Sequence, residues 1–194
     1  MILGSVVLEN DFLRLEPFED HHKEPLRAAC DTDPELWPAF YYNSLGGAEF
    51  DGGWAAMREQ QAAGTRIPFA VVREGDVVGL STFINIQRAD RAVEIGTTYY
   101  RPEARGGVVN PAAKRLLLEH AFACGAQRVS FQVDQINLRS QAAMAKLGAV
   151  REGVMRNDKI TWTGRVRSSV IFSILAEEWP DVRAMLDERL AAFA

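Results

Sequence analysis

The spacing of apolar residues changes part-way along the chain, and this change most limits the folds that the chain can adopt. Three successive segments are rich in β-branched and aromatic residues and are joined by short polar turns, which predicts an antiparallel meander. They are 67–72, 77–86 and 92–100. Further on, Leu117 and Ala121 belong to an apolar set with the helical period of about 3.6 residues. We therefore expect a sheet that begins antiparallel and continues with strand–helix units.

The other segments extend this pattern. Further strands are predicted at 13–17, 128–133, 150–161 and 167–175. Helices are predicted at 20–30, 50–64, 111–124, 137–147 and 179–193, and Asp20 is a candidate cap for the first. Segment 33–53 carries prolines and aromatic residues, which favour an irregular lid or wall. This order predicts an α/β (α+β) fold, with a mixed, mostly antiparallel sheet and helices on both faces.

Length and charge narrow the class of protein. A chain of 194 residues corresponds to about one domain, so 1–194 is expected to be a single domain. The net charge of −4 gives no overall attraction to nucleic acid or to an anionic membrane. Only Cys30 and Cys124 are present, and no leader, transmembrane or metal-ligand pattern is recognisable. We expect a cytoplasmic protein that uses no metal and binds neither nucleic acid nor membrane.

The sharpest chemical feature is segment 101–111, which joins the end of a predicted strand to a predicted helix. Gly106 and Gly107 let a ligand approach the backbone, and the N-terminus of a helix offers free N–H groups to an anion. Arg105 and Lys114 place cations on either side. From spacing alone, a phosphate or pyrophosphate site and a tight turn without a ligand are equally good interpretations.

Two helix starts follow predicted strands. Asn110 is expected to cap the first helix, with Pro111 in its first turn. In the second, Asn137 is the expected cap and Ser140 lies one turn later, an arrangement that is more often structural than functional. Neither G-x-x-x-x-G-K-[ST] nor G-x-G-x-x-G occurs at the glycine pair, which disfavours a nucleotide triphosphatase and a Rossmann dehydrogenase.

Several short motifs in this order and spacing resemble the GNAT N-acetyltransferase superfamily, specifically its ribosomal-protein N-terminal acetyltransferase-like (RimJ/RimL-like) branch. The resemblance covers most of the chain. The motifs are Leu13-Arg14-Leu15-Glu16-Pro17, Val93-Glu94-Ile95-Gly96, Arg105-Gly106-Gly107, Val109-Asn110-Pro111, Asn137-Leu138-Arg139-Ser140, Lys146-Leu147-Gly148-Ala149, Arg151-Glu152-Gly153, Phe172-Ser173-Ile174-Leu175 and Glu178-Trp179-Pro180.

The resemblance implies that acetyl-CoA is the acetyl donor, with its pyrophosphate at the 105–110 turn. Where the family loop usually has Gln or Arg and a second small residue, this chain has Glu103 and Val108. By analogy, Asn137 contacts the pantetheine arm or the sulfur end of the donor, and Ser140 lies where its hydroxyl can meet the thiolate. The residues that the resemblance places around the cofactor are Arg105, Gly106, Gly107, Val108, Asn110, Lys114 and Asn137.

Direct acyl transfer to an amine needs a base, stabilisation of the carbonyl oxygen and a proton for the leaving thiolate. Under the resemblance, Glu94 is the candidate base, acting through water, and Ser140 is the candidate acid. A strand glutamate is otherwise usually a solvated or paired residue. A backbone N–H near Thr97 or Thr98 is the candidate oxyanion donor. For the remaining His, Cys and Tyr residues, a structural role is the favoured interpretation.

The leading functional hypothesis is an acetyl-CoA-dependent N-acetyltransferase that acts on a primary amine. The resemblance to the branch suggests the α-amino group of a protein as the acceptor, and a small-molecule amine is the alternative. A module that binds CoA without turnover is a second hypothesis, which Glu103 and Val108 motivate. A structural partner protein is the third. The oligomeric state stays open, with a homodimer as one outcome.

Overall fold

The computed structural model describes residues 1–193, which fold around one eight-stranded sheet with the strand order β1-β2-β3-β4-β5-β6-β8-β7. The strands are β1 (Leu8–Asn10), β2 (Leu13–Pro17), β3 (Ile67–Arg73), β4 (Asp76–Gln87), β5 (Ala92–Tyr100), β6 (Arg128–Asp134), β7 (Val150–Ile160) and β8 (Val166–Leu175). Only β5 and β6 pair in parallel; the other neighbours are antiparallel. The predicted mixed, mostly antiparallel sheet is confirmed.

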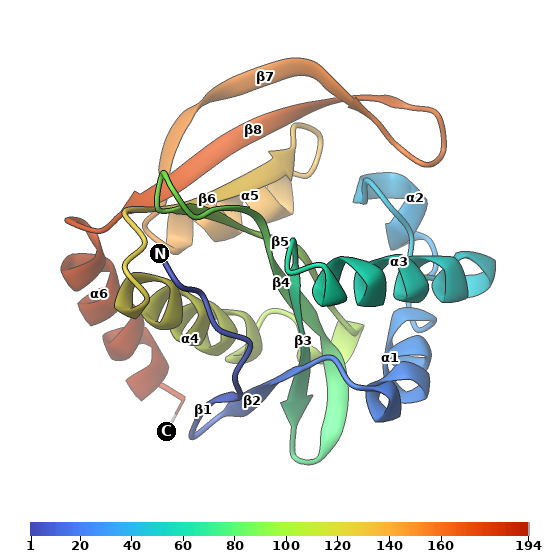
Figure 1. Cartoon of the computed structure of the whole chain (residues 1–194), viewed down its shortest axis with the longest axis horizontal. Coiled ribbons are helices and arrows are strands. Elements are labelled where there is room, and N and C mark those ends of the chain that lie inside the picture. The colour runs from blue at the N-terminus through green and yellow to red at the C-terminus, as the bar shows by residue number, and fades with distance from the viewer. Residues whose placement is uncertain (194) are drawn as a thin grey trace.

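Helices cover both faces of this sheet, as predicted (Figure 1). Those on one face are α1 (Lys23–Cys30), α2 (Leu36–Phe40) and α3 (Phe50–Ala62), and those on the other are α4 (Val109–Ala123), α5 (Leu138–Lys146) and α6 (Trp179–Ala191). Short 3₁₀ turns lie at Asp20–His22, Gly47–Glu49 and Pro102–Ala104. None of the helices within residues 1–193 combines the length and apolar character needed to cross a membrane.

Two apolar cores form because the central strands bury side chains on both faces. On the α4 face, Phe83 and Val129 pack with helix residues such as Leu117. On the α1–α3 face, Leu80 and Tyr99 pack with residues that include Trp37, Phe50 and Trp54 from the helices. Alternate residues of a strand point to opposite faces, so residues of one strand belong to different cores.

The two parallel strands separate soon after they meet. Ala92–Glu94 of β5 pairs with Arg128–Ser130 of β6. The residues of β5 after Glu94 have no pairing partner in β6. Thr97 has a φ of 46°, a strained value for a β-branched residue, where the pairing of β5 with β4 also shifts. Helices α4 and α5 begin beyond the carboxyl ends of β5 and β6, so both helix N-termini flank the opening between the strands.

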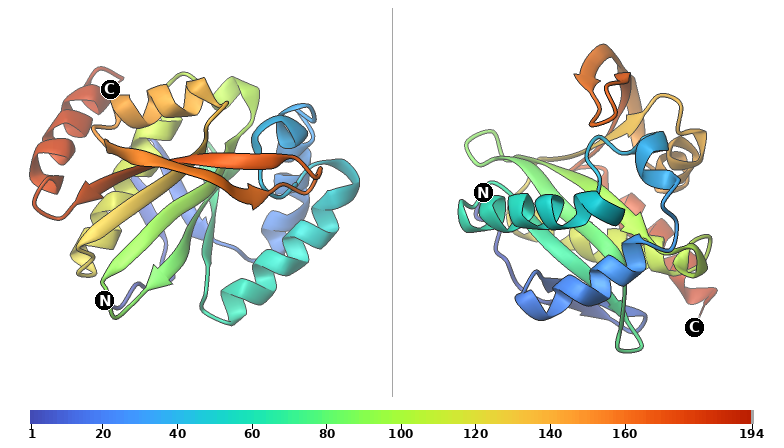
Figure 2. Two further views of the ribbon diagram at one scale, coloured as in Figure 1. Left: turned by 90° about the horizontal axis from the view of Figure 1, so that it is seen from above. Right: turned by 90° about the vertical axis from the view of Figure 1, so that its right-hand side faces the viewer.

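The β7–β8 hairpin projects from one side of the molecule and reaches over α2 (Figures 1 and 2). Its tip is tied to the α2 segment, because the backbone N–H of Trp162 donates to Tyr42 O at 3.0 Å and Arg165 Nη2 donates to Ala39 O. The hairpin tip and α2 therefore lie together at the edge of the α1–α3 face, beyond the end of β5.

The structure corrects four details of the sequence predictions. β1 was not predicted, and segment 33–53 is not irregular throughout, because it contains α2 and the start of α3. Pro38 is tolerated in α2 because it lies in the first turn, where no intrahelical donor is lost. Glu19, not Asp20, is the N-cap of the first helical turn and forms a capping box with His22. Val108, not Asn110, is the N-cap residue of α4.

Candidate active site

The turn before α4 presents a set of free backbone donors. Gly106 has a φ of 77°, a conformation that favours glycine, and a Cβ added at Gly106 or Gly107 would meet nothing within 4 Å. Within residues 1–193, five successive N–H groups have no hydrogen-bond acceptor; they belong to Gly106, Gly107, Val108, Val109 and Asn110. Open space beside several aligned donors at the start of a fifteen-residue helix fits a pyrophosphate.

Arg105 is already engaged by the protein. Its Nε donates to Tyr100 O at 2.6 Å, and its Nη1 donates to Asp33 Oδ2 at 2.5 Å. The side chain lies over the Tyr99 ring, with 5.3 Å between the guanidinium carbon and the ring centroid. Arg105 therefore links the turn to the segment between α1 and α2. Its Nη2 is buried without a partner among the described residues.

Lys114 does not lie beside the turn as a free cation, contrary to the prediction. Its side chain enters the core and is 2% exposed. Its Nζ donates to Thr98 Oγ1 at 2.8 Å and to Ser81 Oγ at 3.3 Å, and lies over the Phe131 ring. Burial lowers its pKa to about 7. Lys114 thus sits beneath the opening between β5 and β6, because helical geometry turns this position of α4 toward the sheet.

The start of α5 has the predicted cap. Asn137 Oδ1 accepts a hydrogen bond from the Ser140 backbone N–H at 3.0 Å, which confirms Asn137 as the N-cap. Asp134, at the end of β6, accepts from the backbone N–H of Ile136 at 3.2 Å. Ser140 is partly exposed in the first turn, on the other side of the opening from the α4 turn.

Glu94 is a buried carboxyl group at the point where β5 and β6 separate. It is 4% exposed, and its Oε2 accepts a hydrogen bond of 2.7 Å from Asn85 Nδ2. Burial raises its pKa above the usual value for glutamate, against the opposing effects of Asn85 and nearby cations. Asn85 reaches it from an irregular part of β4, where φ is 49°. A raised pKa and a protein-held orientation are typical of a general base.

Gly96 keeps the space next to Glu94 open. A Cβ at this position would lie 2.6 Å from Ile84 Cδ1 and 3.4 Å from Glu94 Oε1. Because only glycine avoids this crowding, the backbone of β5 can lie beside the carboxyl group without displacing it.

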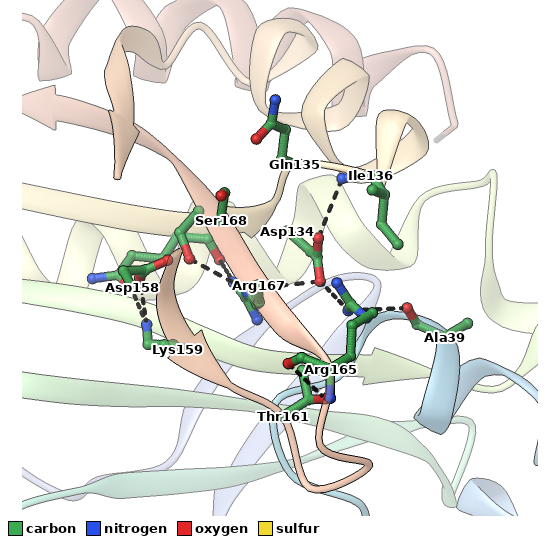
Figure 3. A network of polar contacts seen from close by, with 12 residues as sticks. Ala39, Asp134, Gln135, Ile136, Asp158, Lys159, Thr161, Arg165, Arg167 and Ser168 are labelled. Carbon is green, nitrogen blue, oxygen red and sulfur yellow. Dashed lines mark hydrogen bonds and ion pairs between the residues drawn. The ribbon is translucent and has the colours of Figure 1, made fainter. Parts of the chain in front are cut away.

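A polar network links the end of β6 to the β7–β8 hairpin and the α2 segment (Figure 3). Lys159 Nζ donates to Gln132 Oε1, and Arg167 Nη2 donates to Gln132 O at 3.4 Å. Arg165 Nη2 donates to Asp134 Oδ2 at 2.5 Å. None of these residues was predicted as part of the site, because their proximity depends on strand pairing between distant segments.

Other clusters of polar side chains are less suited to catalysis. Glu16, His21 and His22 have potential ligand atoms within 4.8 Å of one another. Both nitrogens of His22 are already used, since Nδ1 accepts from the Glu19 backbone N–H and Nε2 lies 3.0 Å from Glu16 Oε2. An open pocket of about 450 Å³ lies between β1, α4 and α6 and contains none of the predicted site residues.

The separated parallel strands, the free helix N-terminus and the buried glutamate together form the candidate active site. The model of the GNAT acetyltransferase domain family matches residues 13–150. The chain therefore belongs to the GNAT acetyltransferase family and is an acetyltransferase, as the sequence resemblance implied.

Solved structures agree with this assignment. A protein from T. thermophilus, provisionally described as an acetyltransferase, is 34% identical, with a TM-score of 0.87 over 98% of this chain and 100% of that one. A GCN5-related N-acetyltransferase from Brucella melitensis is 25% identical, with a TM-score of 0.88 over 96% and 86%. Mycobacterium smegmatis RimJ, solved with CoA-disulfide, shares the fold at 22% identity, with a TM-score of 0.79 over 91% and 88%. Comparison with curated protein sequences found no match.

Proposed function

We propose that this enzyme transfers the acetyl group of acetyl-CoA directly to a primary amine, with Glu94 as the general base. The observation that carries the proposal is the position of Glu94. It is buried at the point where β5 and β6 part, and the free N–H groups before α4 lie beyond the carboxyl end of β5. A donor held at the helix N-terminus and extending between the strands would bring its acetyl group toward Glu94.

The donor side depends mainly on the backbone. The N–H groups from Gly106 to Asn110 bind the pyrophosphate, and the α4 dipole adds a favourable field. Arg105 orients the turn through Asp33 and Tyr100 instead of serving as a free phosphate ligand. Lys114 supports β5 from the α4 face of the sheet, through its hydrogen bond to Thr98 Oγ1. These assignments give both cations structural roles: Arg105 at the turn and Lys114 in the core beside β5.

The acceptor amine must lose a proton to become nucleophilic. Ionised Glu94 takes this proton through a water molecule, and the amine lone pair attacks the thioester carbonyl carbon. A backbone N–H near Thr97 or Thr98 stabilises the oxyanion that forms. The C–S bond then breaks, and the electron pair leaves on sulfur. Ser140 lies at the start of α5, where its hydroxyl can hydrogen-bond or protonate the thiolate.

The acceptor that we favour is the α-amino group of a protein or peptide. Ribosomal-protein-S5-alanine acetyltransferase from Vibrio fischeri shares this fold at 16% identity, and RimJ shares it as well. The hairpin tip and the α2 segment form one wall of the site, because the backbone N–H of Trp162 donates to Tyr42 O. A small-molecule amine remains the alternative acceptor.

The test is an assay of thiol release from acetyl-CoA with N-terminal peptides and small amines, together with calorimetry of CoA binding. The proposal expects acceptor-dependent release of thiol and a mass increase of one acetyl group on the acceptor. CoA binding without thiol release from any amine would favour a binding module, and absence of binding would overturn both interpretations.

A further inference from the structure

The face of the sheet that carries Glu94 continues across β6 and β8 as a polar surface. Glu94 pairs with Ser130, so these side chains share a face, and Gln132 follows on the same face two residues later. Arg167 of β8 is paired with Lys159 of β7, and both side chains contact Gln132. Arg167 lies two strands and Lys159 three strands from β5, and both side chains reach back to Gln132 on β6, the strand next to the candidate base.

A third cation approaches Glu94 from the opposite side. Arg66 directly precedes β3. The first residue of β3, Ile67, pairs with Phe83 of β4, and the next residue of β4, Ile84, pairs with Glu94 of β5. Within residues 1–193, the guanidinium of Arg66 forms no hydrogen bond and no ion pair. The charge of Glu94 favours the protonated form of Arg66, while burial lowers its pKa.

Nearby acids do not fully neutralise these cations. Asp158 Oδ2 is 3.7 Å from Lys159 Nζ, and neither Asp158 oxygen has a hydrogen-bond partner among the described residues, although that side chain is only 6% exposed. Asp134 is 3.8 Å from Arg167 Nε, but it is already bound by Arg165.

The cations also retain unused donors. Arg167 uses Nε toward Ser169 and Nη2 toward Gln132, which leaves Nη1 without an acceptor in the described part of the chain. Lys159 is 27% exposed and its Nζ lies 5.9 Å from the centre of the Tyr42 ring, at the boundary formed by the α2 segment. Partly buried cations with spare donors beside the acceptor base are suited to an anionic group.

We propose that Lys159 and Arg167 bind an acidic group of the acceptor, with Arg66 adding positive charge from the other side of Glu94, so that the enzyme prefers amines that carry a carboxylate close to the reacting nitrogen. This inference rests on the proposed function and specifies its acceptor. The carboxylate comes either from a free amino acid or from an acidic side chain near the N-terminus of a peptide.

The test compares kcat/KM for matched acceptors that differ only in the acidic group. One arm uses free amino acids and their carboxamides; the other uses short peptides with Asp or Glu at the second position and their Asn or Gln counterparts. We expect the acid to be preferred by about tenfold or more, in the range of one charge-assisted hydrogen bond. The arm that shows the preference identifies the source of the carboxylate.

The variant Lys159→Gln removes one cation at a partly exposed position, and Arg156→Gln on the same strand is the matched control, because Arg156 is exposed. Lys159→Gln is expected to reduce the preference for the acid about tenfold, through a higher KM for the acid. The control is expected to keep the wild-type preference. Arg66→Gln provides a second, independent loss of charge.

Equal turnover of acid and carboxamide by the wild-type enzyme overturns the inference and leaves the proposed acetyl transfer intact. An unchanged preference in both Lys159→Gln and Arg66→Gln also overturns it. Absence of thiol release with all acceptors, including the carboxamides, overturns the proposed function together with the inference.

Discussion

The donor side and the acceptor side of the candidate site are built from different chemical groups: backbone N–H groups on the donor side and side chains on the acceptor side. The donor side uses backbone N–H groups from one short segment, with Gly106 providing the conformation that exposes them. The acceptor side that we propose uses the side chains of Glu94, Gln132, Lys159 and Arg167, which come from four strands. A ligand shared by a whole family can be bound by a local backbone conformation, whereas acceptor selectivity depends on side chains brought together by the fold.

The largest expected effect separates chemistry from donor binding. Glu94→Gln keeps the shape of the side chain and removes the base, so kcat/KM is expected to fall by about 10²–10³-fold. The Kd for acetyl-CoA, measured by calorimetry, is expected to stay unchanged because the donor side is intact.

The pH profile sharpens this test. A base works only when ionised, and burial raises the pKa of Glu94, so wild-type kcat/KM is expected to fall as the pH drops through that raised value. Asn85→Ala removes a donor that favours the carboxylate and is expected to move this acid limb to higher pH. An acid limb that persists in Glu94→Gln would assign the base to another group.

The second effect concerns Lys114, which lies between the two sides. Its pKa is about 7 in the folded protein and about 10.5 when unfolded, so the unfolded state binds more protons between these values. Wild-type stability is therefore expected to rise between pH 7 and 9, with a contribution of about 2 kcal/mol from this group. As the pH falls below 7, the folded protein also takes up the proton and this contribution levels off.

The measurement is urea unfolding of the wild type and Lys114→Met at both pH values. The variant is expected to lose most of the pH-dependent rise, whereas Lys146→Met, a lysine exposed on α5, is expected to keep it. Equal pH dependence in the wild type and Lys114→Met would show that Lys114 is charged in the folded protein throughout this range.

A third comparison separates the two glycines of the donor turn. Gly106→Ala places a side chain at a φ of 77° and is expected to cost about 1 kcal/mol of stability and to weaken acetyl-CoA binding about tenfold. Gly107→Ala has open space and no positive φ, so it is expected to leave the melting temperature unchanged and to weaken only acetyl-CoA binding. Unchanged binding in both variants would place the pyrophosphate elsewhere.

The sequence predicted the elements of the fold well because its apolar periods and turn residues act locally. The meander from β3 to β5, the start of α5 at Asn137 and the final hairpin all follow from such signals. α2 was missed because its five residues include a proline and aromatic side chains whose burial depends on tertiary packing. β1 was missed because it is only three residues long.

The residues of the site also fall into two groups: those that a local motif indicates and those that only the tertiary structure brings together. Gly106 and Glu94 could be selected from sequence because each lies in a motif, and Glu94 is indeed buried where the strands part. The buried course of Lys114 was missed although a signal was present, since Lys114 lies three residues before Leu117 and seven before Ala121, on the apolar face of α4. Lys159 and Arg167 lie far beyond the end of β5 in the sequence, and no local pattern indicates that strand pairing brings them to Gln132, on the strand next to β5.

The smallest expected effect distinguishes a cap from a catalytic hydroxyl at the start of α5. Asn137→Ala removes the acceptor of the Ser140 backbone N–H and is expected to lower the free energy of unfolding by about 1 kcal/mol. Ser140→Ala keeps that N–H, so its stability is expected to match the wild type while kcat falls a few-fold, because the leaving thiolate loses a hydrogen-bond donor. If Ser140→Ala instead keeps the wild-type kcat from about pH 6 to 9, the thiolate is protonated by another group or by solvent. In that case the donor side would depend on backbone donors alone, and the contrast with the acceptor side would be sharper still.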